Sequence, residues 1–174
     1  KKKMFLLSLC LLLATVGANF VPPKPSTIYH NQKVNHFSPT DTRTFKQKVL
    51  IYEDYYHKSS AKNRPIFFTP GGEAPVIGGY MHNGFMFEMG KSIGALMLFP
   101  EHRYYGDSYP FGPYSQTPLN ITFLNVEQAL ADYVAIIEQT RRDYGMPKDT
   151  VVVAFGGSYP GMLAAYLRVA FPNV

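Results

Sequence analysis

The sequence contains one cysteine, Cys10, and that scarcity excludes a domain held together by disulfides. Cys10 lies within the first 18 residues, which we expect to be removed from the mature protein. The rest of the chain then has no thiol for a disulfide or for a zinc site with cysteine ligands. We therefore expect these 174 residues to rely on a hydrophobic core, and we predict neither a metal nor a cofactor.

Basic charge is also sparse beyond the start of the chain. The formal net charge is +5, but residues 1–18 contribute three lysines and no acidic residue, so the remainder carries +2. That remainder has no cluster of lysine and arginine and no alternation of basic with aromatic residues. We therefore expect no nucleic-acid partner.

The segment KKKMFLLSLCLLLATVGA, residues 1–18, has the pattern of a secretory signal peptide. Its lysines precede an apolar run, and Val16 and Ala18 supply the small residues of a cleavage site. The run is shorter than the ~20 residues that span a bilayer as a helix, so we predict a cleaved signal and no stable membrane anchor. The mature domain would be residues 19–174, in the lysosome or outside the cell. Because position 1 is not methionine, the sequence is interpreted as a gene fragment or as starting at Met4.

Three short apolar runs, at residues 65–69, 95–99 and 151–155, are predicted to be buried strands. Their side chains are apolar at consecutive positions, which is typical of parallel strands covered on both faces. Helical segments are predicted between them, weakly at residues 85–91 and strongly at 126–144. This alternation favours a parallel sheet between helices.

Other segments refine this prediction. Residues 44–56 alternate and are rich in aromatic and β-branched side chains, which predicts an antiparallel pair or one long edge strand. The helix at 126–144 has Asn125 as a predicted N-cap, with Gln128 three residues later, and Gly145 closes its far end. The order of elements is that of the first half of an α/β-hydrolase sheet.

The stretch VVVAFGGSYPGMLAAYLR resembles a nucleophile elbow, in which a strained turn between a strand and a helix exposes a serine, here Ser158. The usual pattern is G-x-S-x-G, and Pro160 replaces the second glycine. That proline leaves intact the N–H of Tyr159, the expected oxyanion donor, and suits the first turn of a helix. The alternative is a Gly-Gly-Ser turn that caps a buried helix without any chemistry.

A serine nucleophile needs a base, and the sequence does not supply one in the expected place. All five histidines precede Ser158, whereas α/β-hydrolases place the acid and the histidine after the serine. An order like that of chymotrypsin, with His102 and a later aspartate, would need a β-barrel, which the helix at 126–144 argues against. We therefore interpret the chain as a fragment that ends after the nucleophile helix and lacks the cap domain and the C-terminal half.

Several separated stretches resemble one family. They are NHFSPTDTRTFKQKVLIY, FFTPGGEAP, ALMLFPEHRYYGDSYPFG, FLNVEQALADYVAIIE and FGGSYPGMLAAYLRVAFP. Together they are similar to the serine carboxypeptidase family of lysosomal Pro-X carboxypeptidase, dipeptidyl peptidase II and thymus-specific serine protease. The resemblance covers roughly residues 31–174. It implies a lysosomal or secreted serine exopeptidase that acts on peptides next to proline, with an α/β-hydrolase fold and a helical cap.

The resemblance also implies roles for single residues. Ser158 matches the nucleophile, and Met162 matches a methionine that lines the pocket for the residue before the scissile bond, although it could equally be a core methionine. Tyr159, Gly72 and Glu73 match the segments that donate to the oxyanion. The aspartate and histidine of the triad are expected beyond Val174.

We also expect roles for four residues in the loops. Glu73 could orient its loop or meet an α-amine, but an ion pair with Arg103 is favoured. His102 and Arg103 are expected to organise the loop after their strand rather than to catalyse. Asn120, in Asn-Ile-Thr, is predicted to be a glycosylation site.

Two other functions remain open at this point. A lipase or esterase could use the same fold, with a broad apolar lid in place of a peptide-binding cap. A non-catalytic binding protein is expected if no downstream aspartate and histidine exist. The sequence does not distinguish carboxypeptidase from dipeptidyl peptidase specificity. It also does not distinguish a monomer from a homodimer.

Overall fold

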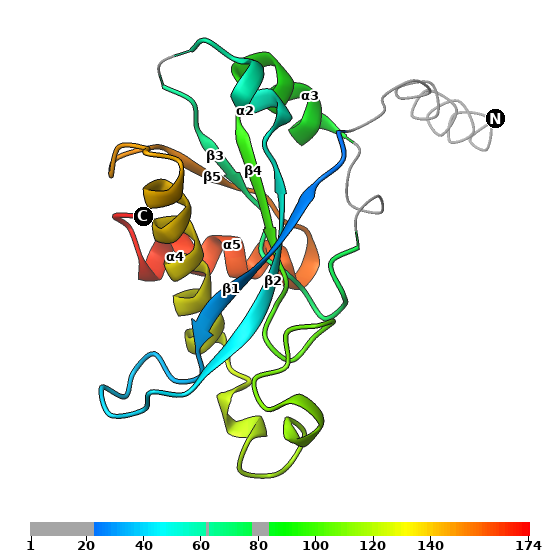
Figure 1. Ribbon diagram of the computed structural model, residues 1–174, viewed down its shortest axis with the longest axis vertical. Helices are drawn as coiled ribbons and strands as arrows, with labels where there is room; N and C mark the ends of the chain where they lie inside the picture. Colours follow the sequence, from blue (N-terminus) through cyan, green and yellow to red (C-terminus); the bar gives the residue numbers. More distant parts are fainter. Residues whose placement is uncertain (1–22, 62, 78–83) are drawn as a thin grey trace, which may run out of the picture.

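The computed structural model describes residues 23–61, 63–77 and 84–174. The predicted signal peptide, residues 1–18, lies outside the described residues. Within them, five strands form one mixed sheet in the order β1-β2-β4-β3-β5 (Figure 1). The strands are β1 (Ser26–Lys33), β2 (Thr44–Tyr52), β3 (Ile66–Phe68), β4 (Leu96–Pro100) and β5 (Val152–Ala154). This is a mixed α/β architecture consistent with an α/β-hydrolase-like fold.

The direction of the strands divides the sheet into two parts. β3 pairs in parallel with both β4 and β5. β2 is antiparallel to both β1 and β4. The prediction of three parallel strands separated by helices is therefore confirmed.

Helices cover both faces of the sheet. One face packs against α4 (Val126–Asp143) and α5 (Ser158–Ala170), through residues that include Tyr133, Ile137 and Leu163. The other face packs against α3 (Phe85–Ile93), whose Phe87 is 1% exposed. β3 and β4 are buried at every position because side chains on both of their faces meet a helix layer.

The N-terminal half differs from the sequence prediction. Residues 44–56 form neither an antiparallel pair nor an edge strand, because β2 ends at Tyr52 and the helix α2 (Asp54–Lys58) follows. β2 is an interior strand, and β1 occupies the edge. β1 was missed because most of its side chains are polar and exposed, as is common at a sheet edge.

The strong helix begins at Val126, as predicted, and ends at Asp143, one residue before the predicted end. The side chain of Asn125 accepts a hydrogen bond from the N–H of Gln128 (2.9 Å), which satisfies one of the unpaired N–H groups at the start of α4. Gly145 has a φ of +59° just after the helix. Glycine adopts this left-handed conformation without a steric penalty, so it can end the helix.

This topology determines where a site can form. Because β3, β4 and β5 are parallel, the loops that follow them meet at one edge of the sheet. Those loops carry residues 69–77, the EHRYYGDS segment and Ser158. In the part of the chain that the structure describes, no helix is both long enough and apolar enough to cross a membrane.

Candidate active site

Ser158 lies on a strained turn between β5 and α5. Its φ is +53°, in the left-handed region that residues with a side chain rarely adopt. Tyr104 is the only other non-glycine residue with a positive φ in the described ranges. Such a conformation costs about 1–3 kcal/mol and persists only when the surrounding structure enforces it. A nucleophile elbow has this strained geometry.

The close approach of strand and helix enforces the turn. A Cβ atom added to Gly156 would lie 2.5 Å from the carbonyl oxygen of Pro160, and one added to Gly161 would lie 3.1 Å from the carbonyl oxygen of Gly156. Real Cβ atoms do not approach backbone as closely as 2.5 Å, so position 156 requires glycine. Gly161 therefore supplies the small downstream residue that the usual motif places at position 160.

The ring of Pro160 points away from this crossing. It lies against Gly72, where an added Cβ would come within 2.9 Å of Pro160 Cγ. The departure from G-x-S-x-G thus places an apolar ring against the glycine-rich loop after β3 and leaves the turn intact.

A cavity of about 220 Å³ joins the elbow to that loop. It is lined by Ser158, Pro160, Phe99 and residues 69–76. The predicted nucleophile and the predicted oxyanion loop, which includes Gly72 and Glu73, are therefore brought together. Glu73 is exposed at this rim.

The backbone offers donors at the elbow and at the loop. Tyr159 is in the first turn of α5, where N–H groups have no intrahelical acceptor. Among the hydrogen bonds between described residues, none uses the N–H of Tyr159 or that of Gly72. Free N–H groups of this kind are what a developing oxyanion requires.

His102 follows β4 and contacts Tyr159 instead of Ser158. Its Nδ1 lies 2.7 Å from the carbonyl oxygen of Arg103, and its Nε2 lies 3.0 Å from the hydroxyl oxygen of Tyr159. Nδ1 therefore carries the proton and donates to the carbonyl, while the Tyr159 hydroxyl donates to Nε2. Burial lowers the pKa of His102 and favours this neutral form. His102 thus holds the side chain of Tyr159, the residue after Ser158.

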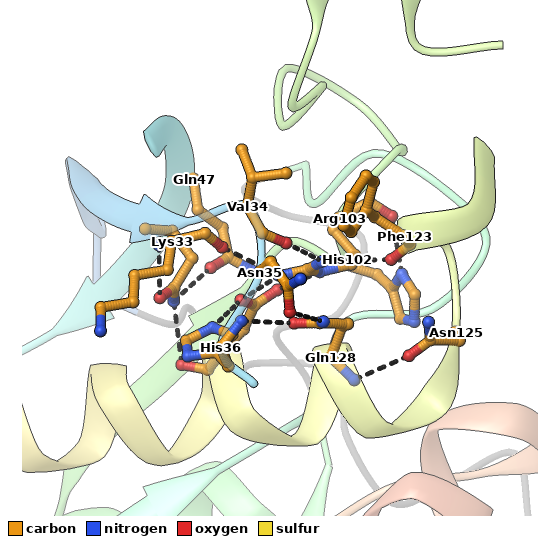
Figure 2. A network of polar contacts seen from close by, with 12 residues as sticks. Lys33, Val34, Asn35, His36, Gln47, His102, Arg103, Phe123, Asn125 and Gln128 are labelled. Atoms are coloured by element: carbon orange, nitrogen blue, oxygen red, sulfur yellow. Dashed lines mark hydrogen bonds and ion pairs between the residues drawn. The ribbon is translucent and has the colours of Figure 1, made fainter. Parts of the chain in front are cut away.

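Arg103 forms a buried ion pair with Asp132 of α4. Figure 2 shows Arg103 in a network of polar contacts that also includes Lys33, Val34 and Phe123. Its Nε and Nη2 donate to the two carboxylate oxygens of Asp132 at 2.7 and 2.6 Å. Its other N–H groups donate to the carbonyl oxygens of Lys33, Val34 and Phe123. Both charged side chains are 0% exposed.

The predicted ion pair between Glu73 and Arg103 is wrong. Among the ion pairs of the described residues, Glu73 has none, and all the donors of Arg103 are used elsewhere. Sequence reasoning missed Asp132, although a signal was present. An aspartate within the apolar face that Ala129, Tyr133 and Ile136 form must be paired when it is buried.

Glu101, the first residue of the EHR segment, connects two loops. Its Oε1 accepts from the N–H of Val76 at 3.0 Å, and its Oε2 accepts from the N–H of Asp107 and the hydroxyl of Ser108, both at 2.8 Å. The carboxylate is fully buried, and a Cβ on Gly106 would lie 2.0 Å from it. Glu101 therefore anchors the end of the loop that lines the cavity.

Two predicted residues lie apart from the cavity. Met162 is 49% exposed on α5 and does not line the cavity. Asn120 precedes the 3₁₀ helix η2 (Ile121–Phe123), and its Nδ2 donates to the carbonyl oxygen of Tyr114 at 3.0 Å. This amide keeps a second hydrogen, so a glycan on Nδ2 is compatible with the bond. The roles of both residues stay predictions.

Between the described residues, the site has a serine and free backbone N–H groups but no base for that serine. No histidine or carboxylate in the described ranges forms a hydrogen bond with the Ser158 hydroxyl. The nearest histidine in the sequence, His102, has both ring nitrogens engaged elsewhere. This arrangement can position a carbonyl against Ser158 and stabilise an oxyanion, and it needs a proton acceptor from another segment.

Comparison with known proteins gives the family. The family model described as serine carboxypeptidase S28 matches residues 32–174. Lysosomal Pro-X carboxypeptidase of Homo sapiens is 38% identical over 173 residues, which cover 93% of this chain and 34% of that protein. The Bos taurus protein of the same name is 40% identical over 152 residues, or 87% of this chain and 30% of its own length.

A more distant relative fits the same pattern. Thymus-specific serine protease of Homo sapiens is 31% identical over 150 residues, which cover 86% of this chain and 28% of that protein. The chain thus spans about a third of the length of these curated relatives. Because the family model covers the elbow, the glycine-rich loop and the EHR segment together, the chain belongs to the serine carboxypeptidase S28 family.

Proposed function

We propose that this chain supplies the nucleophile and the oxyanion hole of a serine exopeptidase that cleaves peptide bonds next to proline. One observation carries the proposal: Ser158 has a φ of +53° on a strand-to-helix turn and lines a cavity together with the glycine-rich loop. A serine that only caps a helix has no need of this strain. The strain therefore favours a catalytic serine over a structural one.

The reaction is acyl transfer through an acyl-enzyme. Ser158 Oγ attacks the scissile carbonyl carbon while a base removes the hydroxyl proton, and the carbonyl electrons move onto its oxygen. The N–H groups of Tyr159 and of Gly72 or Glu73 stabilise that oxyanion. Collapse expels the amine, which receives the proton, and water then hydrolyses the acyl-enzyme. The base and its aspartate come from a segment beyond Val174, in the chain order of α/β-hydrolases.

The substrate class rests on the relatives. The names of the matched human and bovine proteins state carboxypeptidase action at Pro-X bonds, and a third relative is named a serine protease. We extend peptide substrates, a proline next to the scissile bond and a lysosomal or extracellular site of action to this protein. Met162 is kept as a proposed pocket residue on the resemblance alone. The Asn120 glycan belongs to the same secretory assignment.

The test uses the full-length gene product. A fluorophosphonate probe should label the wild-type protein and Ser92→Ala but not Ser158→Ala. Ser92 is a matched control because its exposed hydroxyl donates to the carbonyl of Met89, away from the cavity. Labelling of Ser158→Ala at the wild-type level would contradict the nucleophile assignment.

Substrate panels distinguish the candidate reactions. Xaa-Pro-amides report release of an N-terminal dipeptide, and Xaa-Pro-Xaa peptides with a blocked N-terminus report release of a C-terminal residue. Turnover of either, lost in Ser158→Ala, supports the proposal and chooses the specificity. Hydrolysis of lipid esters without peptide turnover would indicate the lipase or esterase alternative, and no turnover with intact folding would indicate a binding protein.

A further inference from the structure

The loop that lines the cavity, residues 69–76, is hydrogen-bonded at its first and last residues to β4 or to the residue that follows β4. The N–H of Thr69 donates to the carbonyl oxygen of Leu98 at 3.0 Å. The N–H of Val76 donates to Glu101 Oε1 at the same distance. These two hydrogen bonds position the first and last residues of the loop, but they do not orient the peptide groups between them.

A third hydrogen bond to this loop comes from α4, in the helix layer on one face of the sheet. The hydroxyl of Tyr133, on α4, donates to the carbonyl oxygen of Gly71 at 3.0 Å. Tyr133 is fully buried, and burial raises its pKa well above the ordinary value, so its hydroxyl remains a donor. A Cβ on Gly71 would lie 2.3 Å from the backbone nitrogen of His102, so the loop is pressed against the chain at this point.

Because the peptide unit is planar, this hydrogen bond also orients the N–H of the next residue. The described residues contain no cis peptide bond, so the carbonyl of Gly71 and the N–H of Gly72 point in opposite directions. The carbonyl points toward Tyr133 and the core, and the N–H therefore points away from the core. Gly72 lines the cavity that contains Ser158.

We propose that Tyr133 is a positioning residue of the oxyanion hole, whose hydroxyl holds the Gly71–Gly72 peptide so that the Gly72 N–H faces the reacting carbonyl. This inference rests on the proposed function. When Ser158 Oγ bonds to the substrate carbonyl carbon, the π electrons move onto oxygen, and the held N–H donates to it. Loss of one oxyanion donor lowers kcat by about 100–1,000-fold in a well-studied protease, and loss of its orientation should cost part of that.

The ring of Tyr133 has a packing role that must be separated from this one. It packs edge-on against Phe68, with ring centroids 5.4 Å apart. Tyr133→Phe keeps the ring and deletes only the hydroxyl. Tyr104→Phe is the matched control, because the Tyr104 hydroxyl is also buried and also donates to a backbone carbonyl, that of Asn120.

The kinetic test uses full-length protein and a proline-containing peptide substrate. We expect Tyr133→Phe to lower kcat about 10- to 100-fold with KM changed less than twofold, and Tyr104→Phe to stay within threefold of wild type in both. A peptide aldehyde, whose adduct with Ser158 carries the oxyanion, should bind Tyr133→Phe more weakly by a similar factor. Equal kcat in the two variants would overturn the inference.

A second measurement does not depend on turnover. Amide hydrogen exchange of residues 70–76 should be at least fivefold faster in Tyr133→Phe than in Tyr104→Phe, both made in the Ser158→Ala background. Unchanged exchange would overturn the inference even in an inactive protein. Full activity of Ser158→Ala alone would instead refute the proposed function, so the two failures are distinguishable.

Discussion

Replacement of Asp132 by asparagine should be among the most destabilising changes of a single charge in this fold. The five N–H donors of Arg103 meet five acceptors, two of them the oxygens of Asp132 and three of them backbone carbonyls. Asp132 also accepts from His36 Nε2 at 2.7 Å. Asparagine has one acceptor oxygen and turns an NH₂ group toward donors, so at least one N–H of Arg103 loses its partner.

The size of the effect follows from burial. Both partners are 0% exposed, so the guanidinium charge would stay in the core without its carboxylate. Removing one partner of a buried ion pair costs about 3–5 kcal/mol. Because a whole domain is stable by only about 5–15 kcal/mol, this change removes a large share of the free energy of unfolding.

The assay is urea denaturation of the full-length protein, followed by circular dichroism. Asp107→Asn is the matched control, since Asp107 pairs with Lys48 at 3.0 Å but its side chain is 57% exposed. An exposed pair contributes about 0–1 kcal/mol, so this variant should unfold near the wild-type urea concentration. Equal midpoints for Asp132→Asn and Asp107→Asn would refute the reasoning that burial makes the first pair indispensable.

Three further predictions follow from the same structure. Gly156→Ala should lose fluorophosphonate labelling at least tenfold because its Cβ meets Pro160, whereas Gly157→Ala, with nothing within 4 Å of its Cβ, should label within twofold of wild type. Burial lowers the pKa of His102 from its ordinary 6.5, so the unfolded chain binds a proton that the folded chain does not, and stability falls as pH falls below 6.5. The unfolding midpoint of His102→Gln should therefore fall less than that of wild type between pH 7 and pH 5; an equal fall would contradict this sign. The 174-residue chain expressed alone should be inactive and poorly folded, since β5 lies at the sheet edge and Val169 of α5 is 80% exposed. A soluble chain with one cooperative melting transition would contradict that prediction.

The parts of the fold that the sequence predicts are those with local signals. β3, β4 and β5 are apolar at consecutive positions, and α4 repeats its apolar residues with helical spacing. The elbow is likewise local, because the glycines and Ser158 lie within a few residues of one another. β1 has no such signal, since its strand character comes from pairing with β2 and not from an apolar face.

The polar contacts of the site could not be predicted from local sequence patterns. Arg103 and Asp132 are 29 residues apart, and Gly71 and Tyr133 are 62 apart, so no short pattern relates them. Glu73 and Arg103 follow the neighbouring strands β3 and β4, yet they do not pair with each other. Their position after these strands fixes which edge of the sheet the residues share. It does not fix whether a side chain points to the cavity or to the core.

The EHR segment holds the surroundings of Ser158 in place through three different contacts. Its three side chains leave the end of β4 toward different partners: Glu101 toward the cavity loop, His102 toward Tyr159, and Arg103 toward α4 and the end of β1. Each contact fixes a different neighbour of Ser158 or the layer that supports it. Substitutions in this segment should therefore lower stability and activity together. Ser158→Gly should abolish activity and, because glycine adopts a φ of +53° without a steric penalty, leave stability unchanged or slightly higher.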